Sequence, residues 1–149
     1  MSAPTAVRPL APSDRPGWEG LWRAYLAFSG TALPEDIHET TFRRLTDPHN
    51  AERGALVAER EGRLVGLAHY IFHAHNWRGE DVCYLQDLYV GEAARGSGTG
   101  RALIEGVYAA ADANGTPQVY WMTEAGNDGA RQLYDRIGAL TPFIKYQRR

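Results

Sequence analysis

A glycine-rich loop between a strand and a helix is the feature that most constrains how this chain folds. Residues 82–90 predict a long, largely apolar strand, and they run directly into the segment 91–101, GEAARGSGTGR. Beyond the loop, apolar residues over 103–110 fall on one helical stripe, which the Asn114-Gly115 pair is predicted to end. The loop therefore lies at the amino terminus of a helix.

The composition of this loop predicts an anion as its ligand. Backbone amides at a helix amino terminus point outward, and the helix dipole places about half a positive charge there. Gly96, Gly98 and Gly100 remove three Cβ atoms, which permits close approach of a ligand and positive φ angles. Arg95 and Arg101 add side-chain charge. Because each charge-assisted hydrogen bond contributes roughly 1.5–3 kcal/mol, we expect a diphosphate here.

Two nucleotide-binding glycine motifs do not fit the spacing. The dinucleotide fingerprint requires a third glycine where Arg101 stands, and the phosphate loop of nucleotide triphosphatases requires lysine where Ser97 follows Gly96. A turn that serves only to reverse the chain is the purely structural alternative.

The remaining elements follow from periodicity and turn residues. They are an edge strand over 7–10, a helix from 12–14 onward with an aromatic face of Trp18, Trp22 and Tyr25, a helix over 34–45, strands over 55–59 and 64–74 joined by Glu61-Gly62, a strand over 119–123, a helix capped by Asn127 or Asp128 and ending before Gly138, and a last strand over 143–146. The order predicts an α/β (α+β) fold, with helices packed around a mixed sheet, as one domain over residues 1–149. The aromatic face is expected in the core, with a wall of a ligand site as its alternative.

Composition excludes several classes of protein. The formal net charge is −2, so the chain has no basic surface for nucleic acid. The longest charge-free apolar run, residues 64–72, is about half of a membrane span, and the amino terminus has no apolar signal core. With Cys83 as the only cysteine, no internal disulfide forms, and a cytoplasmic location is expected.

Two segments resemble the GNAT superfamily of N-acetyltransferases. The first is Arg95-Gly96-x-Gly98-x-Gly100 after the strand YLQDLYV, and the second is W-x-T-x3-N-x2-A-x2-LYD-x2-GA over residues 121–139. Within the superfamily, the YLQDLYV strand and the LYD helix look most like the polyamine and histone-type branch. The resemblance covers residues 84–139 and implies a central mixed sheet of about six to seven strands, flanked by about four helices and splayed at the fourth strand.

The same resemblance implies a binding site for acetyl-CoA. A bulge would expose backbone groups of the fourth strand to the pantetheine arm. The loop amides, flanked by the two arginines, would hold the pyrophosphate, while Asn127 reaches the pantetheine and Tyr134 lies beside the sulfur. The implied cofactor-binding residues are Leu88, Tyr89, Val90, Arg95, Gly96, Ser97, Gly98, Thr99, Gly100, Arg101, Asn127 and Tyr134.

Transfer of an acetyl group from a thioester to an amine, which the resemblance implies, requires a base and benefits from an acid. A lysine-like amine has a pKa near 10.4, so keeping it neutral at pH 7 costs about 4.6 kcal/mol. Asp87 is the leading candidate for the base, with Glu92 and Glu124 as alternatives that act through water. Gln86 stands where the branch often has glutamate, and it cannot accept a proton. A phenol and a thiol differ by about 2 kcal/mol in acidity, so Tyr134 is the candidate acid for the departing thiolate.

The sequence thus predicts transfer of an acetyl group directly to a primary amine, either on a small molecule such as a polyamine or amino acid, or on a lysine side chain. A non-catalytic acyl-CoA-binding module is the alternative, and Gln86 keeps it open. No metal is expected, and the superfamily suggests a homodimer.

The cysteine and three histidines have simpler interpretations. Cys83 lies in an apolar strand and is expected to be a core residue rather than a nucleophile. His69, His73 and His75 alternate along one strand face and are expected to line the acceptor cleft rather than to bind a metal.

Overall fold

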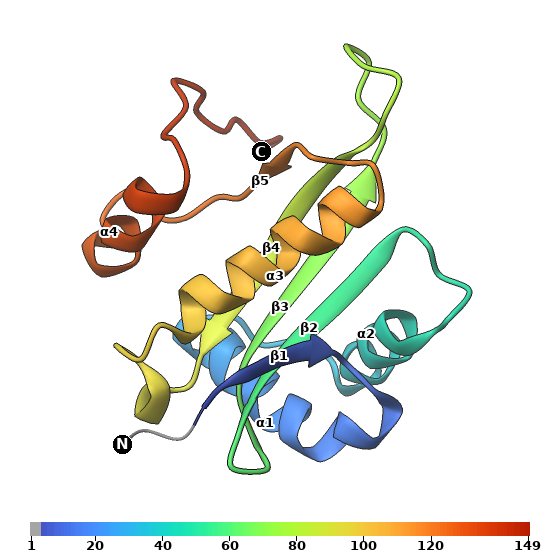
Figure 1. Cartoon of the computed structure of the whole chain (residues 1–149), viewed down its shortest axis with the longest axis vertical. Helices are drawn as coiled ribbons and strands as arrows, with labels where there is room; N and C mark the ends of the chain where they lie inside the picture. Colours follow the sequence, from blue (N-terminus) through green and yellow to red (C-terminus); the bar gives the residue numbers. More distant parts are fainter. Residues whose placement is uncertain (1–3) are drawn as a thin grey trace.

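A computed structural model describes residues 4–149. A five-stranded sheet in the order β1-β2-β3-β4-β5 runs through the molecule, antiparallel except for the parallel β4–β5 pair (Figure 1). The strands are β1 (Ala6–Pro9), β2 (Arg53–Arg60), β3 (Arg63–His73), β4 (Val82–Val90) and β5 (Val119–Tyr120), and the helices are α1 (Arg15–Phe28), α2 (Glu35–Thr46), α3 (Thr99–Ala113) and α4 (Asp128–Ile137), with short 3-10 turns η1 (Pro12–Asp14) and η2 (Glu92–Ala94).

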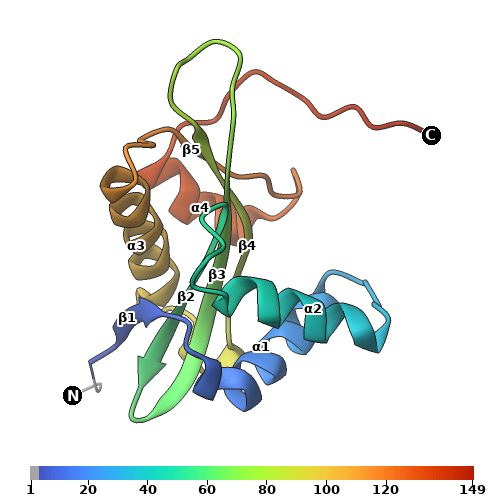
Figure 2. The same ribbon diagram turned by 90° about the vertical axis from the view of Figure 1, so that its right-hand side faces the viewer.

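Helices cover both faces of the sheet. Figure 2 shows α3 on one side of the sheet and α1 with α2 on the other. On the α3 side the buried core includes Leu103, Ile104 and Val107, and α4 packs against the same core. On the α1 side it includes Trp18, which is fully buried, and Phe42. The predicted core position of the first helix's aromatic face is therefore confirmed for its tryptophans.

The β2–β3 hairpin forms as the sequence predicts. Arg60 pairs with Arg63, which leaves a two-residue loop. Both loop residues have positive φ, 53° at Glu61 and 76° at Gly62. Two positive φ angles match the right-handed twist of the flanking strands, so this turn sets the register next to it. A bulge then shifts the register by one residue from the Ala58–Gly66 pair onward.

A bulge in β4 reverses the faces of its side chains. Asp87 lies opposite His69, while Leu85 lies opposite Tyr70, so Gln86 is an extra residue with no partner in β3. Leu85 and Leu88 therefore both face the α3 core, although they are three positions apart. The residue at 87 is consequently turned toward α1, where without the insertion it would point at α3.

The predicted splay at the fourth strand is also present. β5 pairs with β4 only at Cys83–Val119 and Tyr84–Tyr120. Beyond Tyr84 the two segments separate, so the rest of β4 has no neighbouring strand on that side. A site can open between them.

The sheet has fewer strands than the six to seven expected. Within residues 4–149, the strand predicted over 119–123 has only two paired residues, and the strand predicted over 143–146 does not form. Residues 139–149, here called the C-terminal arm, instead lead away from the body in an extended path (Figure 2). The apolar residues of the arm give it strand character, but a strand requires a partner, and no strand in the described part of the chain pairs with the arm. Among the described residues, no helix is long and apolar enough to span a bilayer.

Candidate active site

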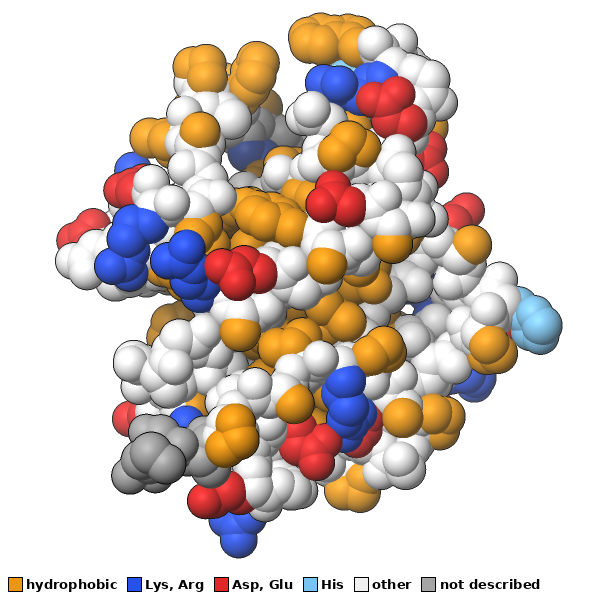
Figure 3. Space-filling view, viewed as in Figure 1, with side chains coloured by type: hydrophobic (Ala, Val, Ile, Leu, Met, Phe, Trp, Pro, Cys, Tyr) orange, Lys and Arg blue, Asp and Glu red, His pale blue; other side chains and the backbone are white. Residues whose placement is uncertain are grey.

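A cavity of about 470 Å³ lies where β4 and β5 diverge. Its walls come from the end of α1, from β4, from the segment that follows β5, and from α4. The lining residues are Tyr25, Phe28, Ser29, Leu85, Gln86, Leu88, Tyr89, Trp121, Met122, Thr123, Glu124, Gly126, Asn127 and Tyr134. In the space-filling view, the surface is indented between the α4 region and the lower part of the molecule (Figure 3).

Of the β4 residues predicted to bind the cofactor, Leu88 and Tyr89 line this cavity and Val90 does not. All three lie on the part of β4 that has no partner on the β5 side. The Val90 carbonyl accepts a hydrogen bond of 3.2 Å from Nε of Arg95. An unpaired strand edge of this kind can accept an extended ligand as a substitute strand.

The glycine loop has the conformation that an anion site requires. Gly96 and Gly98 have φ angles of +78° and +83°, and Gly98 is the N-cap of α3. A Cβ at either position would meet nothing within 4 Å, so backbone conformation and not crowding demands glycine here. The Thr99 hydroxyl lies 2.7 Å from that of Ser97, which also donates to the Ala94 carbonyl. The first amides of α3 lie just beyond this turn.

Both loop arginines already have partners within the chain. The guanidinium of Arg95 lies over the rings of Phe28 and Tyr89, at 5.9 and 5.7 Å. Arg101 donates to Glu105 at 2.8 Å in an exposed i,i+4 pair. Exposed pairs of this type contribute at most about 1 kcal/mol, so a bound phosphate can compete for Arg101.

Tyr134 and Asn127 reach the cavity from the second half of the predicted motif. Asn127 is the N-cap of α4, and its side-chain oxygen accepts a hydrogen bond from the Ala130 amide at 3.4 Å. Tyr134 packs edge-on against Trp121, with ring centroids 5.5 Å apart. Burial raises the pKa of Tyr134 above its usual value, so the group is a phenol at neutral pH.

Asp87 lies behind the wall of the cavity and is not part of its lining. Its side chain is 13% exposed, and Oδ2 lies 3.0 Å from Nδ1 of His69. The neighbouring residue Tyr25 does line the cavity, and its pKa is raised by burial and then by the charge and hydrogen bonding of Asp87. Tyr25 therefore borders both the cavity and Asp87.

The alternative carboxylates lie in different places. Glu124 lines the cavity directly, as does Gln86 of the bulge. Glu92 is exposed on η2, outside the lining residues. Of the two alternatives to Asp87, only Glu124 is in direct reach of a ligand.

The expectation that three histidines line the cleft is wrong, because none of them is among the residues that line this cavity. His69 is 4% exposed and hydrogen-bonded to Trp18. The outcome follows from β3 pairing, which turns residue 69 toward α1. His73 contacts the hydroxyl of Tyr120 at 2.8 Å, and His75 lies beyond the end of β3. Within residues 4–149 no group of three or more His, Cys, Asp or Glu side chains is arranged to hold a metal ion.

Cys83 is fully buried, and burial raises its pKa to about 11. A thiol in this state is a poor nucleophile at neutral pH. The interpretation of Cys83 as a core residue is confirmed.

Sequence reasoning missed part of the cavity wall. Phe28 and Ser29 sit at the carboxyl end of α1, and no motif marks them. The aromatic spacing that suggests an acceptor wall does find Tyr25, which lines the cavity while Trp18 and Trp22 are buried.

Comparison with known proteins agrees with this geometry. The sequence profile of the Acetyltransferase (GNAT) family matches residues 18–139. The D-amino-acid N-acetyltransferase HPA3 of Saccharomyces cerevisiae is 43% identical over 143 residues, which cover 95% of this chain and 89% of that protein. A mycothiol acetyltransferase of Streptomyces avermitilis is 32% identical over 91% of this chain and 42% of its own length.

Among solved structures, an aminoglycoside N-acetyltransferase AAC(6')-Iy in complex with CoA superposes with a TM-score of 0.85. The match covers 100% of this chain and 97% of that one at 16% identity. At this level of identity the likeness concerns the fold.

Proposed function

Because the chain belongs to the acetyltransferase (GNAT) family and is an acetyltransferase, we propose that it transfers the acetyl group of acetyl-CoA directly to the primary amine of a small molecule. The observation that carries this proposal is the cavity at the β4–β5 splay, whose wall includes the unpaired edge of β4. The glycine turn before α3 does not line the cavity, but it follows β4 directly along the chain, after η2. A ligand with an extended arm and a diphosphate matches both features.

The proposed placement of the cofactor uses this chain's own groups. The backbone of Leu88–Val90 takes the pantetheine arm, and the amides from Gly96 to Arg101 take the pyrophosphate. Asn127 and Tyr134, which line the cavity, flank the reactive end. The left-handed turn at Gly98 and the empty space around it support this arrangement.

In the proposed reaction, the amine nitrogen bonds to the acetyl carbon as the carbon–sulfur bond breaks. Asp87 accepts the amine proton through the Tyr25 hydroxyl or a water molecule, and Tyr134 protonates or hydrogen-bonds the departing thiolate. Burial raises the pKa of Tyr134, which keeps the phenol protonated at neutral pH and supports its role as a hydrogen-bond donor to the thiolate.

We propose an amino acid as the first acceptor class, with polyamines and lysine side chains as the others. Support comes from the relative that is 43% identical and is named for D-amino acids. The cavity also has the dimensions of a small ligand, with aromatic walls at Tyr25, Phe28 and Trp121 and the polar groups of Ser29 and Glu124.

A thiol-release assay with acetyl-CoA and a panel of amines tests this function. The panel contains D-phenylalanine, D-alanine, their L-enantiomers, spermidine and Nα-acetyl-lysine. We expect turnover of at least one amine, with the D-amino acids fastest. Tight binding of CoA in isothermal titration without turnover of any amine would instead identify a non-catalytic acyl-CoA-binding module.

Two glycines at opposite ends of α3 provide a matched test of the cofactor site. Gly98 and Gly115 both have positive φ, +83° and +70°, and a Cβ at either would meet nothing within 4 Å. Replacing either glycine with alanine should therefore lower the free energy of unfolding by about the same amount, roughly 1–2 kcal/mol. We expect Gly98→Ala to weaken CoA binding at least tenfold in isothermal titration, and Gly115→Ala to leave it unchanged. Equal affinities would contradict the placement of the pyrophosphate.

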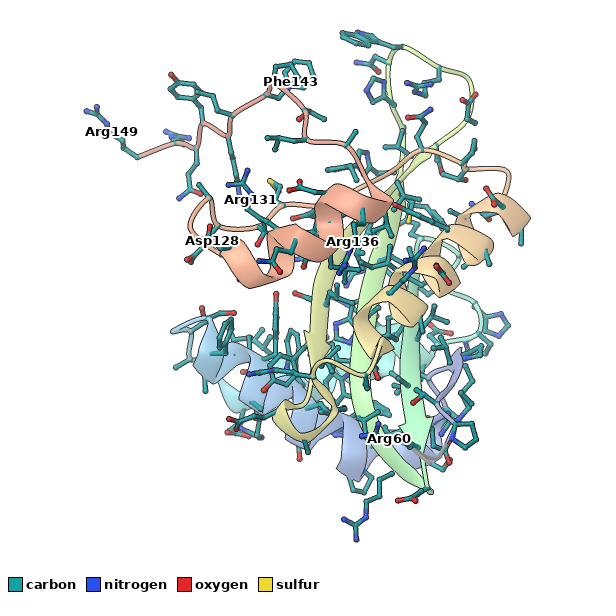
Figure 4. All side chains as sticks on the ribbon, turned by 60° about the vertical axis from the view of Figure 1, so that its left-hand side comes forward. Arg60, Asp128, Arg131, Arg136, Phe143 and Arg149 are labelled. Atoms are coloured by element: carbon teal, nitrogen blue, oxygen red, sulfur yellow. The ribbon has the colours of Figure 1, made fainter. Side chains whose placement is uncertain are left out.

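The homodimer is proposed to form through the C-terminal arm. Leu140, Phe143, Ile144 and Tyr146 are 79%, 79%, 77% and 87% exposed, and Phe143 projects away from the sheet (Figure 4). Each such side chain contributes roughly 1.5–3 kcal/mol when buried. β5 is an edge strand, so its outer side is open to the arm of a second copy.

Light scattering coupled to size exclusion tests this interface. We expect the full chain to be a dimer and the double variant Phe143→Glu/Ile144→Glu to be a monomer, because the two substitutions place negative charge where the proposed dimer would bury the arm. Arg149→Glu, which changes charge at the end of the arm without removing an apolar contact, is the control. A monomeric full chain would exclude the proposal.

A further inference from the structure

A buried hydrogen-bonded chain connects α1 to the candidate base. Nε1 of Trp18 donates to Nε2 of His69 at 3.0 Å, and Nδ1 of the same ring lies 3.0 Å from Oδ2 of Asp87. Trp18 is fully buried and His69 is 4% exposed. Neither ring lines the cavity.

The indole determines which nitrogen of His69 carries the proton. An indole N–H can only donate, so Nε2 of His69 must accept. In a neutral imidazole the proton then sits on Nδ1, where it is donated to the Asp87 carboxylate. A proton on Nε2 would point directly at the Trp18 N–H, so this geometry selects the tautomer with the proton on Nδ1.

We infer that His69 is a positioning residue that fixes the Asp87 carboxylate for proton transfer. Its Nδ1–H occupies Oδ2 and limits rotation of the carboxylate, while Oδ1 has no contact with His69. The inference rests on the proposed role of Asp87 as the base. It goes beyond that role because it assigns a task to two buried residues, His69 and Trp18, that do not touch the ligand.

The β4 bulge is what makes the contact possible. The extra residue Gln86 turns Asp87 to the α1 side of the sheet, directly opposite His69 in the β3–β4 register. On that side the other titratable groups near Asp87 are tyrosines, Tyr25 of α1 and Tyr84 of β4. The contact of His69 with Asp87 joins Nδ1 to Oδ2 at 3.0 Å.

Two substitutions at His69 separate positioning from packing. In His69→Asn the amide nitrogen takes the place of Nδ1 and still donates to Asp87. In His69→Gln the longer side chain reaches the place of Nε2, accepts from Trp18 and leaves Asp87 without a donor. Both variants lose the imidazole ring, and thermal unfolding measures that common loss.

With acetyl-CoA and the fastest amine of the panel, we expect His69→Gln to lower kcat about tenfold and His69→Asn to stay within threefold of the parent. The KM for acetyl-CoA should change in neither variant. Equal kcat values for the two variants would overturn the inference, because loss of packing alone affects both alike.

The tautomer of His69 provides a readout that does not depend on activity. In ¹⁵N NMR of the full chain, with the His69 signals assigned by their absence in His69→Asn, we expect Nδ1 protonated and Nε2 unprotonated. An Nε2–H tautomer or an imidazolium at neutral pH would overturn the inference. Full turnover by Asp87→Asn with the expected tautomer present would instead reject Asp87 as the base while leaving the geometry intact.

Discussion

Replacing Tyr134 with phenylalanine is expected to lower kcat by about 10²–10⁴-fold, the range typical of a lost general acid or base. The ring remains, so its edge-on contact with Trp121 and the wall of the cavity are preserved. Only the hydroxyl, which is the group proposed to act on the thioester sulfur, is removed. The Kd for CoA in isothermal titration should therefore stay within a factor of about three.

The pH profile adds a second readout for Tyr134. Burial raises its pKa above the ordinary value of 10.0, so the protonated form persists to higher pH than for a free phenol. The protonated hydroxyl that acts as the donor is present at pH values below its pKa, and it is lost as the pH rises through that pKa. The parent enzyme should therefore show no loss of kcat from this group up to about pH 10.

Tyr108→Phe is the matched control for Tyr134→Phe. The Tyr108 hydroxyl donates to the Ile137 carbonyl at 2.9 Å, and the residue lies outside the main cavity. Loss of the Tyr108 hydroxyl should lower the free energy of unfolding by about 1 kcal/mol and leave kcat unchanged. If Tyr134→Phe turns over as fast as Tyr108→Phe, Tyr134 is not the acid.

Local sequence rules predict the glycine turn and the β2–β3 hairpin because their causes are local. Positive φ at Gly98 and at Glu61-Gly62 is encoded within a few residues of each turn. The position of Tyr134 near the site is implied by the resemblance of residues 121–139 to the GNAT superfamily, because its spacing from the helix cap at Asn127 does not by itself place it on a cavity wall.

The face of the sheet on which Asp87 lies depends on the bulge in β4, which shifts the alternation of side chains between the two faces. Cys83 and Leu85 share the α3 face with Leu88, so the alternation shifts by one residue near Gln86. The apolar pattern contains this shift, but it does not identify the extra residue. Because the extra residue determines the face, the contact between Asp87 and His69 could not be derived from the sequence.

The arm is the clearest failure of local prediction. Residues 143–146 have strand composition, yet pairing requires a second strand, and propensity alone does not provide one. The same limit applies to Arg95, whose contacts with Phe28 and Tyr89 join segments distant in sequence.

Replacing Asp87 with asparagine is expected to lower kcat/KM for the amine by about 10²–10³-fold at pH 7. Asparagine keeps an oxygen that can accept from Nδ1 of His69, so the buried chain and the fold should persist. It cannot accept the amine proton. The rate of Asp87→Asn then depends on the fraction of the amine that is already neutral in solution. That fraction rises about tenfold per pH unit below the amine pKa near 10.

Glu124→Gln and Glu92→Gln are the controls for Asp87→Asn, since each removes one carboxylate from the other candidate positions. Glu124 lines the cavity and Glu92 lies outside it, so these variants also separate direct contact with the ligand from catalysis. We expect Glu124→Gln to raise the KM for a cationic amine with kcat within threefold, and Glu92→Gln to change neither constant. A profile of Asp87→Asn parallel to that of the parent from pH 6 to 9, or a larger loss of kcat in Glu124→Gln, would move the base from β4 to the segment that follows β5. In that case the Asp87–His69 contact would be a structural feature of the sheet rather than part of the proton path.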